Sequence, residues 1–201
     1  MSLVDLIARA DERGLAASGL ACLDRCVPLL GGDDEVLRPL WSSLADGGAD
    51  ADAWGERLAK ARAELDCADP SADTVPGLGP DPAPGSGSGA ETETEAAVSD
   101  EDRAAALARR MLATAPGDPC ASALRGWADA CSAAALQIHR LLDVAADGDG
   151  PLVAAERRRQ VAVLELLAGR GASGLRPALE VSTEGRRVLR AVVSRRARGR
   201  S

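Results

Sequence analysis

Residues 118–142, DPCASALRGWADACSAAALQIHRLL, carry the clearest helix signal in the chain. Asp118 is a favourable helix N-cap, and Pro119 suits the first helical position, where a backbone N–H is not needed. After them, apolar residues recur at alternating spacings of four and three: Cys120, Leu124, Trp127, Cys131, Ala134, Ile138 and Leu141. This heptad pattern predicts one long helix, ending near residue 146, that presents an apolar seam to another helix.

The neighbouring segments extend this helix into a helical hairpin. Residues 148–151, GDGP, are typical of a turn. A helix that packs back on the first is indicated by an apolar face made of Val161, Leu164 and Leu167. Upstream, Ser99 and Asp102 match a capping box for a shorter helix. We expect a last helix to begin near residue 182 or 183.

The first 68 residues predict a bundle of four short amphipathic helices. The first is expected to begin after Ser2 and to end at Gly14. The second runs from about Leu15 toward Pro28, and the third follows the acidic pair at 33–34. The fourth carries an apolar stripe with helical spacing: Trp54, Leu58, Ala61 and Leu65.

Between the two helical halves, residues 69–98 are rich in Pro, Gly and small polar residues. Such a segment cannot bury enough apolar surface to offset the entropy of ordering it, so we expect a disordered linker. The prediction is therefore an all-α protein with an N-terminal helical bundle at 1–68, a linker at 69–98 and a C-terminal helical hairpin domain at 99–201. Whether the two halves pack together is left open.

The composition favours helices and a cytoplasmic location. The chain has no Phe and no Tyr, so its core must come mainly from Leu, Val and Ala, and Leu and Ala are strong helix formers. The N-terminal stretch MSLVDLIARADER carries Asp5, Arg9, Asp11 and Glu12 where a signal peptide would be apolar. No window is long and apolar enough to span a membrane. The five cysteines are scattered and odd in number, which is typical of reduced thiols.

The sequence predicts no metal site, no cofactor and no enzyme active centre. Cys22 and Cys26 project from one flank of a helix, but tetrahedral zinc needs two further ligands, and the chain has no second pair. His139 is the only histidine. On a helix it points about 80° away from Cys131, so we expect a partly exposed side chain beside the core position Ile138. The sequence has no P-loop, no GxGxxG after a predicted strand and no GxSxG motif.

Cys120 has two interpretations. In the first turn of a helix, exposed backbone N–H groups favour the thiolate, which would suit a thiol-dependent redox protein. Cys120 also occupies the first position of the heptad seam, and the only histidine that could act as a base lies far along the helix. We expect it to pack in the core, and we keep the redox function as a third alternative.

Charge is distributed unevenly along a chain whose net charge is −7. Residues 1–75 carry 15 acidic and 7 basic side chains, whereas residues 151–201 carry 4 acidic side chains and 12 arginines. On a helical wheel the tail has an apolar arc, with arginines mostly opposite. Its candidate partner-binding residues are Arg186, Arg187, Arg190, Arg195, Arg196 and Arg198.

We expect these arginines to contact acidic protein surface, within the chain or on a partner. An exposed part of the seam would seek another helix, which makes Trp127 a further partner-binding candidate and self-association an alternative. The predicted function is a non-catalytic adaptor, scaffold or regulatory subunit. A nucleic-acid-associated regulator is the second choice, because the chain is acidic overall and no aromatic residue lies near the arginines. A membrane partner is not expected.

Overall fold

The computed structural model describes residues 2–45, 51–66, 99–143 and 150–199, and every regular element in these ranges is helical. The all-α class is therefore confirmed. The predicted linker at 69–98 lies outside the described residues. The elements are α1 (Leu3–Arg9), α2 (Glu12–Cys26), η1 (Val27–Leu29), α3 (Arg38–Ala45), α4 (Ala51–Asp66), α5 (Asp100–Ala113), α6 (Ala121–Leu142), α7 (Pro151–Arg170), η2 (Gly171–Gly174) and α8 (Leu175–Gly199).

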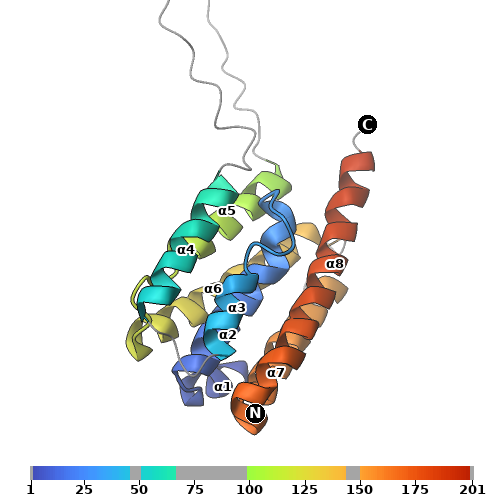
Figure 1. Ribbon diagram of the computed structural model, residues 1–201. Coiled ribbons are helices and arrows are strands. Elements are labelled where there is room, and N and C mark those ends of the chain that lie inside the picture. Colours follow the sequence, from blue (N-terminus) through green and yellow to red (C-terminus); the bar gives the residue numbers. More distant parts are fainter. Residues whose placement is uncertain (1, 46–50, 67–98, 144–149, 200–201) are drawn as a thin grey trace, which may run out of the picture.

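Helix α2 forms the centre of the bundle because small and apolar residues cover most of its circumference. All of its residues from Gly14 to Cys26 are buried. The helices α6, α7 and α8, from the C-terminal half of the chain, pack against it (Figure 1). One continuous hydrophobic core therefore contains residues from both halves. The described helices of the two halves therefore pack together, which the sequence alone did not determine.

Helix α4 also joins the two halves, at the C-terminal end of α5. The last carbonyl groups of a helix have no partner within the helix, and an arginine side chain can satisfy them. The guanidinium of Arg62 donates hydrogen bonds to the carbonyl oxygens of Leu112, at 3.2 Å, and Ala115, at 2.7 Å. The indole N–H of Trp54 donates to the carbonyl of Pro116 at 2.7 Å. These contacts fix α4 on the end of α5.

Two predicted helix starts are present in the structure, and one predicted helix end is not. The capping boxes begun by Ser2 in α1 and Ser99 in α5 are both present, which confirms those predictions. The prediction that Gly14 ends the first helix is wrong. Helix α1 ends at Arg9, and Gly14 lies in the first turn of α2, where its N–H donates to the side chain of Asp11 at 2.7 Å.

The apolar face of α6 is wider than the predicted heptad seam. Cys120 is the N-cap, outside the helix and exposed, so Pro119 is not the first helical residue. Ala134 and Leu141 are only partly buried. The buried residues are Leu124, Trp127, Ala128, Cys131, Ser132, Ala135, Ile138, His139 and Leu142. The seam prediction fails at these positions because α6 packs on several helices, namely α2, α5 and α7, instead of one partner.

Helix α8 is longer than predicted, because it begins at Leu175 instead of near residue 182. Pro177 lies in its first turn, where a missing N–H breaks no bond within the helix. The chain reaches α8 from α7 through Gly171, whose φ of 54° suits glycine. Helices α7 and α8 therefore run antiparallel, with Gly185 beside the side chain of Arg159.

Trp127 lies in the core, which is where its position in the apolar pattern placed it. Its side chain is buried, with 4% of its surface exposed. The ring meets that of Trp54 edge-on, with centroids 6.3 Å apart, and its N–H donates to the carbonyl of Met111 at 2.9 Å. In this structure the chain itself therefore covers almost all of the Trp127 side chain.

We predict that Trp127→Ala lowers the free energy of unfolding by about 3 kcal/mol or more, because it leaves a cavity and breaks the contact with Trp54. Urea denaturation measures this change. Gln137→Ala, at an exposed position of the same helix, is the control and should change the stability by less than about 0.5 kcal/mol. A loss below about 1 kcal/mol for Trp127→Ala would contradict its place in the core.

Candidate functional site

The face that α8 turns to the bundle is polar in its middle part. Its buried residues are Leu175, Ala178, Ser182, Gly185, Arg186 and Leu189. Between the two leucines no large apolar side chain is fully buried, although Leu179 and Val181 pack against the core while partly exposed. The packing of α8 on α2 and α7 therefore also uses polar contacts, and two groups of residues supply them.

The first group is built on a buried ion pair between Arg25 of α2 and Glu156 of α7, whose side chains are 0% exposed. The guanidinium donates from Nε to Oε2 at 2.8 Å and from Nη2 to Oε1 at 2.6 Å. Moving each charge out of water costs several kcal/mol, roughly. The two parallel hydrogen bonds of this bidentate pair help to offset that cost. Burial favours the neutral form of Glu156, but Arg25 outweighs it, and the pKa of the carboxyl lies below its ordinary value.

Two further polar side chains extend the ion pair to α6. The amide of Gln160 donates to Oε1 of Glu156 at 2.8 Å. The hydroxyl of Ser132, in α6, donates to Oε1 of Gln160 at 2.7 Å. Each buried polar group in this row thus has a partner, which is the condition for a polar network to stabilise a core.

Helix α8 closes over the ion pair through two small residues. The Nη1 atom of Arg25 lies 3.5 Å from the hydroxyl oxygen of Ser182. A Cβ atom on Gly185 would overlap the Cδ and Cγ atoms of Arg25. Only glycine at this position lets α8 approach the guanidinium so closely.

His139 belongs to the same buried region, and the prediction of a partly exposed side chain is wrong. It is 1% exposed. Its Nδ1 lies 2.8 Å from the carbonyl oxygen of Ala135, and its Nε2 lies 3.7 Å from Oε2 of Glu156. Burial lowers the pKa of the imidazole, although Glu156 opposes this effect. The histidine is therefore a neutral part of the core near neutral pH.

The second group fixes the next turn of α8 to the N-terminal half. Arg186, which is 4% exposed, donates from Nη1 to Oδ1 of Asp24 at 2.8 Å and to the carbonyl of Asp34 at 2.7 Å. Arg190 donates from Nη1 to Oδ2 of Asp34 at 2.8 Å. Two of the six candidate partner-binding arginines therefore contact acidic residues of the N-terminal half of the chain, and Arg186 is buried there.

Asp24 is the weak member of this group. Burial raises the pKa of its carboxyl to about 6, although Arg186 and Arg25 lower it. Its Oδ2 atom is buried and has no hydrogen-bond partner. Because the folded pKa lies above the ordinary value of 3.8, the folded state holds a proton that the unfolded state has lost. Ionisation of Asp24 therefore reduces the stability as the pH rises through about 6.

We predict that Asp24→Asn removes this loss. Between about pH 5 and pH 7 the unmodified chain should lose about 1 kcal/mol of unfolding free energy relative to the variant. The titration of His139 acts in the opposite direction, but it is common to both proteins and cancels in the difference. Urea denaturation at the two pH values measures the effect, with Asp129→Asn at an exposed position of α6 as the control. Parallel pH profiles for the chain and the Asp24 variant would contradict the prediction.

The other four candidate arginines are exposed or partly exposed. Arg187 lies 3.9 Å from Glu184 on the same helix, and Arg196 donates to the carbonyl of Leu141 at 3.4 Å. Arg195 and Arg198 are exposed and have no ion-pair partner among the described residues. These two side chains are the ones that remain available to another molecule.

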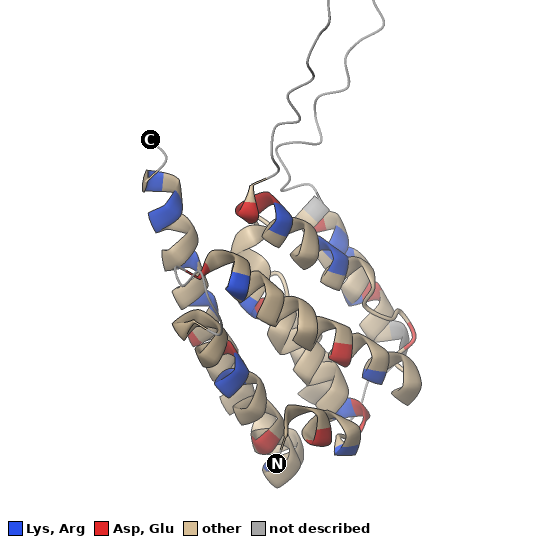
Figure 2. Cartoon of the chain, turned by 180° about the vertical axis from the view of Figure 1, so that it is seen from behind, with Lys and Arg blue, Asp and Glu red and all other residues tan. Residues whose placement is uncertain are grey.

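Both available arginines lie on the last turns of α8, residues 191–199, which we call the distal segment. None of its residues is buried, since the last buried residue of α8 is Leu189. Gly185 packs beside Arg159, so α8 passes the first residue of α7, Pro151, at about residue 193. Figures 1 and 2 show this end of α8 at the edge of the bundle, with basic residues on its final turns. Positive charge at a helix C-terminus complements the helix dipole.

Cys120 is placed differently from the prediction, whereas Cys131 is buried, as its position in the apolar pattern predicted. Cys120 is exposed, and its Sγ lies 3.5 Å from the hydroxyl of Ser122. Hydrogen bonds from Ser122 and from the backbone of the first turn lower the pKa of this thiol. Its expected place in the core is therefore wrong, because the helix begins after it. Cys22, Cys26 and Cys131 are buried, and burial raises the pKa of Cys22 to about 12.

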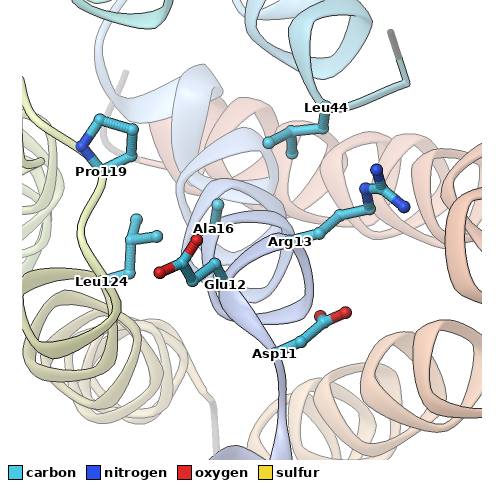
Figure 3. Close-up of a pocket in the computed structure, with 7 residues that line it drawn as sticks. All are labelled: Asp11, Glu12, Arg13, Ala16, Leu44, Pro119 and Leu124. Carbon is cyan, nitrogen blue, oxygen red and sulfur yellow. The ribbon is translucent and has the colours of Figure 1, made fainter. Parts of the chain in front are cut away.

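A charged cavity lies at the start of α2 (Figure 3). Its volume is about 390 Å³, and it is lined by Asp11, Glu12, Arg13, Ala16, Leu44, Pro119 and Leu124. Figure 3 shows Glu12 on one side of α2 and Asp11 and Arg13 on the other, so the charged groups do not converge. Among the described residues, no group of three His, Cys, Asp or Glu side chains could hold a metal ion, and no helix could cross a membrane.

Comparison of the chain with models of protein families, with curated proteins and with solved structures found no match in any of the three. The candidate site therefore has to be judged from its own residues. The buried groups that sequence reasoning missed are Asp24, Arg25, Glu156 and Gln160. The part of the candidate site that is open to another molecule is the distal segment of α8.

Proposed function

We propose that this protein is a non-catalytic adaptor, scaffold or regulatory subunit that binds an acidic surface of a partner protein through the distal segment of α8. The observation that carries the proposal is the exposed pair Arg195 and Arg198 on helical turns without any buried residue. Guanidinium groups bind carboxylates in a bidentate manner. We also propose a cytoplasmic location, where the thiols stay reduced.

The non-catalytic part of the proposal is supported by the roles of the buried titratable groups. Glu156 is held by Arg25 and Gln160, and His139 is enclosed beside them. General acid–base catalysis requires such groups to reach a substrate. In this arrangement they stabilise the packing of four helices instead.

The second candidate, a nucleic-acid-associated regulator, loses support from the contacts of Arg186 and Arg190. Both side chains are paired with Asp24 or Asp34 of the same chain. Of the six candidate arginines, Arg187 and those of the distal segment then remain to meet phosphates. Two or three such contacts give a salt dependence with a log–log slope of about −2 to −3 on duplex DNA, which is small for a nucleic-acid-binding protein.

The test compares the full chain with the double variant Arg195→Glu, Arg198→Glu. Arg110→Glu, Arg125→Glu is the matched control, since it changes the net charge equally at exposed positions of α5 and α6. Affinity capture from the native host, followed by mass spectrometry, should yield a protein with an acidic surface. The distal variant should lose this protein and the control should keep it.

Each protein is also titrated with random-sequence duplex DNA and single-stranded RNA at two salt concentrations. We expect weak binding that the distal variant hardly changes. Submicromolar binding near about 150 mM salt that requires Arg195 and Arg198 would instead establish the nucleic-acid function. Capture that is equal for the full chain and the distal variant would contradict the proposed contact.

A further inference from the structure

A groove with a volume of about 560 Å³ runs between α7 and α8, on the side that faces away from α2. Its apolar residues are Ala155, Ala162, Leu166, Pro177 and Val181, and all of them are partly exposed. The two alanines allow another helix to approach α7 closely. An antiparallel helix pair with such a strip can pack on a second pair to form a four-helix bundle.

The two walls of this groove carry opposite charges. The α7 wall has Arg158 and Arg159, and the α8 wall has Glu180 and Glu184. Arg158 is exposed and has no ion-pair partner among the described residues. Glu184 is 65% exposed, and its partner Arg187 is 3.9 Å away. Such exposed pairs are weak, so Glu184 can exchange its partner at little cost.

We propose that a second copy of this chain covers the groove and forms a dimer with two-fold symmetry. A symmetric interface must be complementary to itself. A two-fold axis parallel to the helices meets this condition, because it places α7 of each copy on α8 of the other. Each basic wall then faces an acidic wall. A second copy carries the same basic wall and the same acidic wall, so its charges are complementary to those of the groove.

The register of the helices brings particular charges together. Within one copy Gly185 packs beside Arg159. Under the parallel axis, Arg158 of one copy therefore lies within about 3 Å, measured along the helix, of the partner's Glu184.

The other two-fold axis in the plane of the groove is unfavourable. An axis perpendicular to the helices would pack α8 on α8 and bring Glu180 and Glu184 against their own copies. Like charges opposed across an interface exclude such pairings. The dimer does not rest on the proposed function, because the arginines of the distal segment do not line this groove.

The test is the mass of the full chain in solution, measured by sedimentation or light scattering over about a hundredfold range of concentration. We expect the mass to rise from 20.6 kDa toward twice that value. Arg158→Glu and Glu184→Arg should each weaken the dimer by about tenfold or more, because each opposes like charges twice. Arg125→Glu, at an exposed position of α6, is the control and should dimerise normally.

An equal mixture of the two variants gives the decisive result. Positions 158 and 184 are then both acidic in one copy and both basic in the other, so both contacts are restored and a heterodimer should form. Circular dichroism shows that each variant is folded, since both positions are exposed. A chain that stays at 20.6 kDa at every concentration overturns the proposal. The proposal is also overturned if both variants dimerise as strongly as the unmodified chain, or if the two variants form no heterodimer when they are mixed.

Discussion

The buried ion pair between Arg25 and Glu156 is the interaction on which the arrangement of the helices depends. It joins α2 of the N-terminal half to α7 of the C-terminal half, and both side chains are fully buried. Leu and Ala pack almost equally well in several registers, so an apolar core of this composition specifies its helix positions poorly. A buried charge pair accepts only the geometry in which both charges are satisfied. The ion pair thus selects one register for α2 and α7.

Ion pairs between the two halves also account for part of the uneven charge of the chain. The acidic N-terminal half and the arginine-rich C-terminal half meet along α8, where Arg186 contacts Asp24 and Arg190 contacts Asp34. These contacts hold α8 on a face that has few apolar residues. Beyond Arg190 the ion pairs with acidic residues of the N-terminal half end, and Arg195 and Arg198 are exposed to solvent. The tail therefore serves the fold over its proximal part and leaves only its distal part for another molecule.

Local signals predicted the helices well, because capping and helical spacing act within a few residues. The capping boxes at Ser2 and Ser99 and the stripe from Trp54 to Leu65 are all present. Where the prediction failed, a competing local contact decided the outcome. Asp11 caps α2, so Gly14 became part of a helix instead of its end. The start of α6 after Cys120 moved that thiol from the seam to the surface.

The buried polar network could not be predicted, because its members are distant in sequence. Glu156 opens the stretch ERRRQ, and on a charged helix nothing distinguishes it from an exposed residue. Its partner Arg25 lies 131 residues away. The burial of His139 follows from the same network, since α6 turns a wider face to the core than a heptad requires. One local feature agrees with a polar contact in the core: Glu156 and Gln160 lie four residues apart, so they share one side of the helix next to apolar positions.

Native-state hydrogen exchange in the Glu156→Gln variant tests the central claim most directly. The substitution leaves the charge of Arg25 buried without a counter-charge, which costs about 3–5 kcal/mol. Glu165→Gln, at an exposed position of the same helix, is the matched control. If the ion pair holds the two halves together as one cooperative unit, the backbone amides of α2 and α7 should lose equal protection in the Glu156 variant and none in the control. Loss of protection in α7 while α2 keeps its own would contradict this account.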